Sequence, residues 1–141
     1  TEATYYDIVK RFGPEVAILV LELTKYKDLK NEIGKTKYLE IKMKNMSSLA
    51  LVIKLCDRLA NICDLENVDD KFRKKYITET IEILNYVTDN RNLSKTHIKI
   101  MQYILYHIMI LKNEYQLQDI ENQRKIPQIE NKIKILKCKT Y

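Results

Sequence analysis

Polar residues recur at one-turn intervals in the apolar stretch between residues 52 and 65, and their types suit chemistry on phosphates or metals. These residues are Lys54, Asp57, Asn61 and Asp64. At about 3.6 residues per turn, spacings of three, four and three place them on one side of a helix. A carboxylate beside an apolar surface is costly to bury unless it pairs with a cation or binds a metal. The stretch therefore predicts either a site built around Asp57 or an ordinary surface ion pair between Lys54 and Asp57.

The remaining residues of this stretch are those expected of a packing face. Leu55, Leu59 and Ile62 project from other parts of the helix surface than the polar residues. Ser47 and Ser48 precede the stretch, and serine is a preferred N-cap residue. We therefore expect a helix that begins at these serines, buries its apolar side and presents the polar one.

Helix is predicted along nearly the whole chain, which has 141 residues with two glycines and two prolines. Thr4 and Asp7 resemble a capping box for a helix that ends at Gly13. Pro14 suits the first position of a second helix, whose nearly continuous apolar surface predicts a central place. Further helices are expected at about 36–46, 69–87, 93–117 and 128–137, with Thr36 as a cap, a loop at 25–35 and an interruption at Pro127. The predicted fold class is all-α, with one domain.

The charge of the chain is compatible with several kinds of partner. The formal net charge is +6, with modest basic clusters at residues 71–75 and 132–139. A polyanionic small substrate, a nucleic acid with tyrosines as stacking platforms, and a plain solvated helix surface would each explain it. Nucleic acid is the least favoured of the three. No apolar run approaches the roughly 18 residues that cross a bilayer, and the three cysteines form no C-x-x-C pair. We therefore expect no membrane segment, reduced thiols and a cytoplasmic location.

Two ordered motifs carry a more specific signal. Residues 54–65 read K-L-C-D-R-L-A-N-I-C-D-L, and residues 1–25 contain T-E-A-T, D-I, F-G, E-V, L-V and L-T-K in that order. Together they resemble the HD-domain hydrolases of (p)ppGpp, whose signature is K-L-A-D-[RK]-L-x-N-[ML]-R-[TD]-L. The resemblance covers roughly residues 1–112. It implies an HD-domain-like helical bundle, incomplete at its N-terminus, with residues 113–141 as a helical C-terminal extension.

The resemblance also implies roles for particular residues. Asp57 matches a ligand of the family's single metal ion, usually Mn²⁺, which activates a water that attacks the 3′-diphosphate of (p)ppGpp. Asn61 and Asp64 match contacts with the nucleoside. Lys54 matches a signature lysine that orients Asp57 or faces a phosphate. Tyr76 is expected to line the same pocket.

The chain departs from the family pattern in ways that bear on catalysis. The family's H…H-D-x-x-E-D residues, which supply the other metal ligands, would precede Thr1. His97 and His107 lie far downstream, are not followed by Asp, and are expected to be interfacial or half-buried. Cys63 replaces the family's arginine, and Ala60 stands where the bacterial type has histidine. We therefore expect this chain to lack most metal ligands and to hold no catalytic residue of its own.

Two functions of different classes remain open. The first is the C-terminal portion of a metal-dependent guanosine-3′,5′-bis(diphosphate) 3′-pyrophosphohydrolase, truncated and inactive as this chain alone. Its ligand would be guanosine tetraphosphate or a related 3′-phosphorylated nucleotide. The second is a non-catalytic helical remnant that acts by partner or nucleotide binding. The sequence predicts no oligomeric state.

Overall fold

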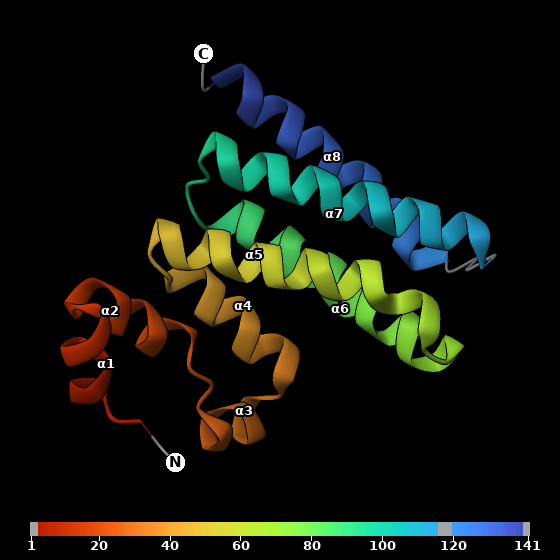
Figure 1. Cartoon of the computed structure of the whole chain (residues 1–141). Helices are drawn as coiled ribbons and strands as arrows, with labels where there is room; N and C mark the ends of the chain where they lie inside the picture. Colours follow the sequence, from red (N-terminus) through yellow and green to blue (C-terminus); the bar gives the residue numbers. More distant parts are fainter. Residues whose placement is uncertain (1–2, 116–119, 140–141) are drawn as a thin grey trace.

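The computed structural model describes residues 3–115 and 120–139, in which all regular structure is helical (Figure 1). The predicted all-α class is confirmed. The elements in chain order are α1 (Tyr5–Phe12), α2 (Pro14–Leu23), α3 (Lys27–Ile33), α4 (Lys35–Asn45), α5 (Ser48–Cys63), the 3₁₀ helix η1 (Asp64–Asn67), α6 (Asp70–Asn90), α7 (Lys95–Glu114) and α8 (Ile120–Lys139).

Several helices begin and end where local side chains predict. The Thr4 hydroxyl accepts a hydrogen bond from the Asp7 N–H at 3.3 Å, and the Asp7 carboxylate accepts one from the Thr4 N–H at 2.9 Å. This reciprocal pair is the predicted capping box of α1. Gly13 ends α1 with φ of 87°, a conformation that L side chains rarely adopt, and Pro14 opens α2. Ser47 caps α5 as expected.

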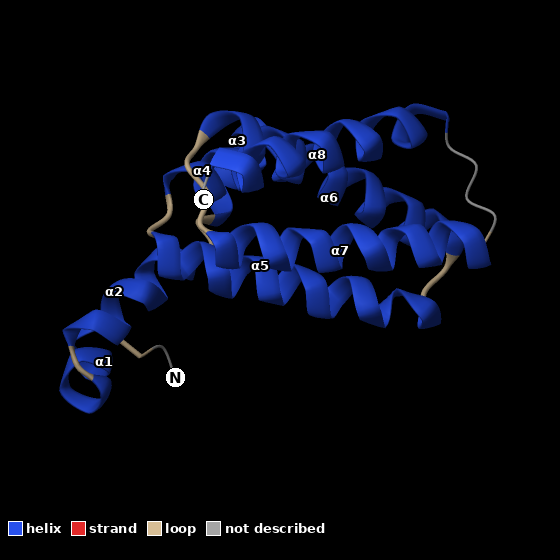
Figure 2. Cartoon of the chain, turned by 90° about the horizontal axis from the view of Figure 1, so that it is seen from above, coloured by secondary structure: helices blue, strands red, loops and turns tan. Residues whose placement is uncertain are grey.

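The core lies between α5, α6 and α7, with α4 and α8 packed on α6. α5 and α7 run side by side, and α8 lies along α6 and α7 (Figures 1 and 2). Apolar residues at one-turn spacing on α6 and α7 face inward, as the sequence predicted. Fully buried side chains include Leu51, Leu55, Ile62, Ile77, Ile81, Leu84, Met101, Ile104 and Ile108. This packing fixes the rotation of α5, and therefore the direction in which its polar side faces.

The C-terminal helix packs back on the bundle. Ile126, Ile129 and Ile133 are buried in the common core. The predicted interruption at Pro127 is wrong, because Pro127 lies inside α8 and is exposed. A proline removes one backbone donor from a helix, but burial of isoleucines on both sides of it keeps this helix continuous. Leu117, the predicted end of the preceding helix, lies outside the described residues.

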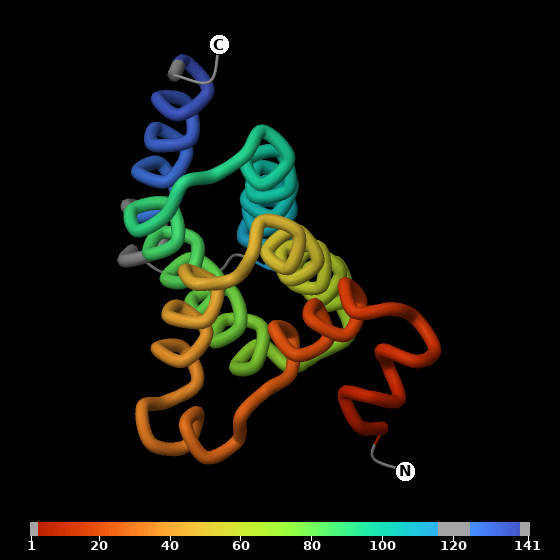
Figure 3. The backbone as a smooth tube through the Cα atoms, turned by 90° about the vertical axis from the view of Figure 1, so that its left-hand side faces the viewer, coloured from red at the N-terminus to blue at the C-terminus, as the bar shows by residue number. Residues whose placement is uncertain are grey.

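The predicted central position of α2 is also wrong. Only Ala17 of this helix is buried, whereas Ile18 is 52% and Leu21 45% exposed. α2 packs on α1 and on α5, and the two N-terminal helices lie at one edge of the bundle (Figures 1 and 3). Hydrophobicity on all sides predicted burial, but the described residues bring no further helix against the outer face of α2.

The segment at 25–35 is not the predicted loop. Residues 27–33 form α3, and α4 begins at Lys35 directly after Gly34, which has φ of 85°. The predicted Thr36 cap is therefore wrong, since Thr36 lies inside α4. The short helix α3 packs on α4. No helix among the described residues is long and apolar enough to cross a membrane.

Candidate functional site

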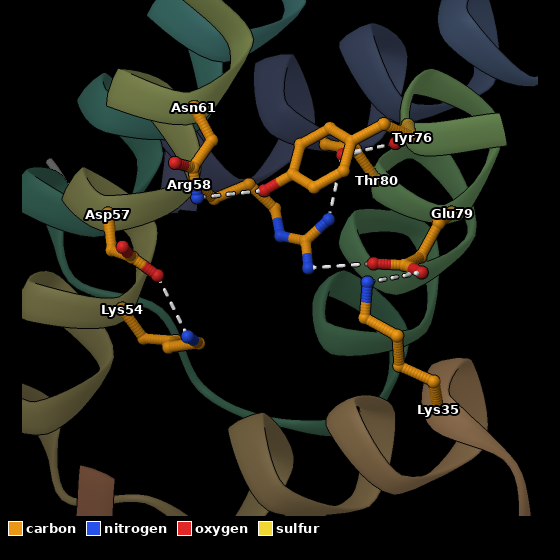
Figure 4. Close-up of polar contacts among 8 residues, drawn as sticks. All are labelled: Lys35, Lys54, Asp57, Arg58, Asn61, Tyr76, Glu79 and Thr80. Atoms are coloured by element: carbon orange, nitrogen blue, oxygen red, sulfur yellow. Dashed lines mark hydrogen bonds and ion pairs between the residues drawn. The ribbon is translucent and has the colours of Figure 1, made fainter. Parts of the chain in front are cut away.

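The polar side of α5 opens on a concave surface rather than on a flat one. The Lys54 Nζ atom donates to the Asp57 Oδ2 atom at 2.8 Å, with the Lys54 side chain 13% and the Asp57 side chain 53% exposed (Figure 4). The i,i+3 ion pair that the spacing offered as an alternative is thus present. Both partners also line a cavity, so the pair does not exclude a site.

This cavity has a volume of about 110 Å³ and is bounded by α3, α4, α5 and α6. The side chains that line it are those of Lys25, Lys30, Lys35, Tyr38, Leu39, Lys54, Asp57, Arg58, Asn61 and Tyr76. Five of them are cationic and one is anionic. Charges of one sign around a cleft focus the field and attract ligands of the opposite sign. The cavity therefore suits a polyanion.

Three larger grooves lack this concentration of charge. One of about 440 Å³ lies between α7 and α8, one of about 540 Å³ is lined mainly by apolar side chains of α3 and α4, and one of about 420 Å³ lies along α7. Ligand sites combine a concave surface with a few convergent polar groups. The smaller cavity meets both conditions, and we assign the candidate site to it.

A buried ion pair forms the wall between α5 and α6. The Arg58 guanidinium donates to the Thr80 hydroxyl at 2.9 Å and to the Glu79 carboxylate at 3.1 Å (Figure 4). The second oxygen of Glu79 lies 3.2 Å from the Lys35 Nζ atom. The five cations of the cavity therefore face two carboxylates, Asp57 and Glu79, which leaves a formal excess of three positive charges.

Tyr76 closes the cavity from α6. Its hydroxyl accepts a hydrogen bond from the Asn61 side-chain amide at 3.1 Å, and its ring lies 4.8 Å from the Arg58 guanidinium (Figure 4). Burial raises the pKa of the Tyr76 hydroxyl, against the opposing effects of Arg58 and Asn61. The phenol is therefore protonated at neutral pH, and its O–H remains a donor for an anionic ligand.

The structure brings together four of the five predicted site residues. Lys54, Asp57, Asn61 and Tyr76 line the cavity. Asp64 does not line it, because it lies at the C-terminal end of α5, where it opens the 3₁₀ helix. The predicted roles of all five in binding stay predictions.

Sequence reasoning missed part of the site. Lys25, Lys30 and Lys35 join it only because α3 and α4 fold beside α5. Arg58 directly follows Asp57 in the quoted motif, which was a usable signal. Its partner Glu79 lies 21 residues away on α6, a distance at which spacing along the chain carries no information.

The described residues do not by themselves fit a divalent metal ion. A metal site needs three or more converging ligands, and no cluster of three His, Cys, Asp or Glu side chains occurs in the described part of the chain. Asp57 offers a suitable oxygen, but the side chains around it are largely cationic. No catalytic step can be derived from these residues alone.

The buried histidine of α7 is a structural residue. The His97 Nδ1 atom accepts the Ser94 N–H at 3.0 Å, and its Nε2 atom lies 2.8 Å from the Ser48 carbonyl oxygen. Because Nδ1 accepts, the proton belongs on Nε2, which donates to that carbonyl. The Nδ1 contact caps the start of α7, and the Nε2 contact joins it to the start of α5. Both ring nitrogens are therefore engaged, so His97 is not available as a metal ligand.

The fold and the cavity together define a class of protein: a helical domain with a cationic pocket suited to phosphate groups. Comparison with known proteins identifies two relatives of this chain. The chain is similar to the guanosine-3′,5′-bis(diphosphate) 3′-pyrophosphohydrolase of Aquifex aeolicus (strain VF5), with 38% identity over 92 residues, which cover 59% of the chain and 12% of that protein. It is also similar to a guanosine-3′,5′-bis(diphosphate) 3′-pyrophosphohydrolase of Drosophila melanogaster, with 41% identity over 66 residues, which cover 47% of the chain and 36% of that protein.

These relatives confirm the resemblance to HD-domain (p)ppGpp hydrolases as a partial relationship. The matched segments span about an eighth of the first relative and about a third of the second. No family model and no solved structure matches the chain.

Proposed function

We propose that this chain supplies the nucleotide-binding wall of a guanosine-3′,5′-bis(diphosphate) 3′-pyrophosphohydrolase, with the diphosphate groups held in the cationic cavity. The observation that carries the proposal is the convergence of five cationic side chains with Asp57, Asn61 and Tyr76 on one cavity. The substrate in this proposal is that of the two relatives, which are both guanosine-3′,5′-bis(diphosphate) 3′-pyrophosphohydrolases. Residues 1–112 would form the hydrolase portion, and residues 113–141 a helical extension, within a cytoplasmic protein.

The cavity offers different groups to different parts of such a ligand. Lys25 and Lys30 supply point charges for phosphate oxygens, as lysine does in many phosphate sites. The Tyr76 O–H supplies a neutral donor. The Asn61 side-chain nitrogen donates a hydrogen bond to the Tyr76 hydroxyl. Its amide oxygen would accept a hydrogen bond from a ribose hydroxyl.

In this proposal the described residues would supply only one ligand of the metal ion. Asp57 would be one ligand of a divalent ion, Mn²⁺ by the resemblance, and the other ligands would come from groups outside the described residues. In this proposal the cationic cavity binds the nucleotide without these other ligands. The second candidate function is partner or nucleotide binding without catalysis, for which the cationic cavity would be enough.

Isothermal titration of guanosine tetraphosphate into the chain tests the binding step. We expect Lys25→Glu and Lys30→Glu each to weaken binding by about tenfold, since each places a carboxylate against a polyanion. Lys44→Glu is the matched control, because Lys44 is exposed on α4 and does not line the cavity. Absence of binding by the unaltered chain, or equal losses in all three variants, would overturn the proposal.

Pyrophosphate release distinguishes the two candidates in a longer form of the protein that carries the other metal ligands, because this chain alone is expected to be inactive under both. Release by that form with added Mn²⁺, lost in its Asp57→Ala variant, supports the hydrolase. Binding without release by that form supports the non-catalytic candidate.

A further inference from the structure

We propose that Phe72 is a stacking platform for the base of the nucleotide whose diphosphates occupy the cavity, an inference that rests on the proposed function. Phe72 lies in the first turn of α6, and its ring is stacked on that of Tyr76, with centroids 6.1 Å apart and planes 20° from parallel. Tyr76 lines the cavity and is partly buried, whereas Phe72 is 49% exposed. The two rings therefore continue the wall of the cavity outward to the solvent.

Exposure of a phenylalanine carries no conclusion by itself, since single exposed apolar residues are common. Other exposed aromatic residues are Tyr6 and Phe12 on α1 and Tyr103 and Tyr106 on α7. Tyr26, which precedes α3, is also exposed and donates its backbone N–H to the hydroxyl of Tyr38 at 2.9 Å, a contact that does not involve the Tyr26 ring. Among the described residues, Phe72 is the exposed aromatic ring that stacks on a side chain of the cavity wall. Its position, not its exposure, marks it as part of the site.

The chemistry of the two surfaces matches the two parts of a nucleotide. The cavity carries an excess of positive charge and suits phosphates, whereas the Phe72 ring is flat, neutral and apolar. A nucleobase is also flat, and one sugar separates it from the phosphates. Phe72 and Tyr76 are four residues apart, slightly more than one helical turn and roughly 6 Å along the axis. An inorganic polyphosphate would make no use of such a ring.

The two carboxylates nearest to Phe72 in the chain both have partners within the protein. The Asp69 carboxylate accepts the Phe72 N–H at 2.9 Å as the cap of α6, and the Asp70 carboxylate pairs with Arg73. Both carboxylates next to the platform are thus engaged by the protein.

The first experiment compares a nucleotide with a ligand that lacks a base. We expect Phe72→Ala to weaken binding of guanosine tetraphosphate by about tenfold, equivalent to about 1.4 kcal/mol and within the range for base–aromatic stacking. Binding of inorganic pyrophosphate should not change. Tyr103→Ala, at a residue 50% exposed on α7, is the matched control and should alter neither ligand. Because Phe72 is half exposed, the variant is expected to fold, which circular dichroism checks.

A second variant gives a direct signal of contact. The chain contains ten tyrosines but no tryptophan, so Phe72→Trp introduces a single tryptophan, which can be excited selectively, and preserves a stacking surface. Guanosine tetraphosphate should quench its emission and pyrophosphate should not, whereas Tyr103→Trp should respond to neither.

The outcomes separate this inference from the proposed function. Unchanged nucleotide affinity in Phe72→Ala, or equal losses for nucleotide and pyrophosphate, overturns the platform and leaves the cationic cavity standing. Failure of the unaltered chain to bind either ligand removes both proposals.

Discussion

Replacing Arg58 by alanine tests whether the wall of the cavity depends on a buried ion pair. The side chains of Arg58 and Glu79 are only 4% and 5% exposed, and the guanidinium also donates to Thr80. Removing one partner of a buried pair costs about 3–5 kcal/mol, because the remaining charge stays desolvated. In the variant, Glu79 keeps its ion pair with Lys35. We therefore expect a loss of stability at the lower end of this range, about 3 kcal/mol.

Urea denaturation followed by circular dichroism measures this loss as a lower midpoint at an unchanged slope. For a chain of this length, about 3 kcal/mol corresponds to a decrease in Tm of roughly 10 °C. Lys35→Ala is the matched control on the same carboxylate. Lys35 is 47% exposed, and an exposed ion pair contributes about 0–1 kcal/mol.

A double variant distinguishes the energetic effect of the Arg58–Glu79 ion pair from the effect of lost side-chain packing. Arg58→Met combined with Glu79→Leu removes both charges and retains apolar volume, so it should cost less than Arg58→Met alone. The reasoning is refuted if Arg58→Ala costs less than about 1 kcal/mol, or if the two single changes simply add in the double variant.

Two further predictions concern the ends of the chain. The Thr4 hydroxyl and N–H lower the pKa of Asp7 in the folded state, so its stabilising contribution is present above the ordinary aspartate pKa and is lost as the pH falls through the lowered one. Protection of the α1 amides, measured relative to the intrinsic exchange rate at each pH, should therefore fall in acid in the unaltered chain and much less in Thr4→Ala, and an equal fall in both would contradict the cap assignment. Ile129 is fully buried in α8, so Ile129→Ala should cost about 2–5 kcal/mol in urea denaturation. A loss below about 0.5 kcal/mol, as at an ordinary surface position, would mean that α8 does not share the core.

Local features of the sequence predicted much of the fold. Thr4, Gly13 and Ser47 set helix ends through hydrogen bonds or dihedral angles within a few residues. The wrong predictions arose where local preference and packing disagreed. Pro127 was expected to break a helix that burial keeps intact, and α2 was expected inside although it lies at an edge.

The sequence also predicted part of the candidate site. The one-turn spacing of Lys54, Asp57 and Asn61 placed three of its residues on one side of a helix, because side-chain directions follow from helical geometry alone. Tyr76 was placed there by resemblance to a family, and not by spacing.

The sequence by itself determined most of the helices, several of their ends, the apolar faces of α6 and α7, and the polar side of α5. Each of these depends on interactions within about four residues along the chain. Only the tertiary structure decided that Lys25, Lys30 and Lys35 approach α5, and that Arg58 pairs with Glu79. The reason is physical: contacts between helices depend on how whole faces pack and cross, and periodicity along one helix does not specify which other helix its side chains will meet.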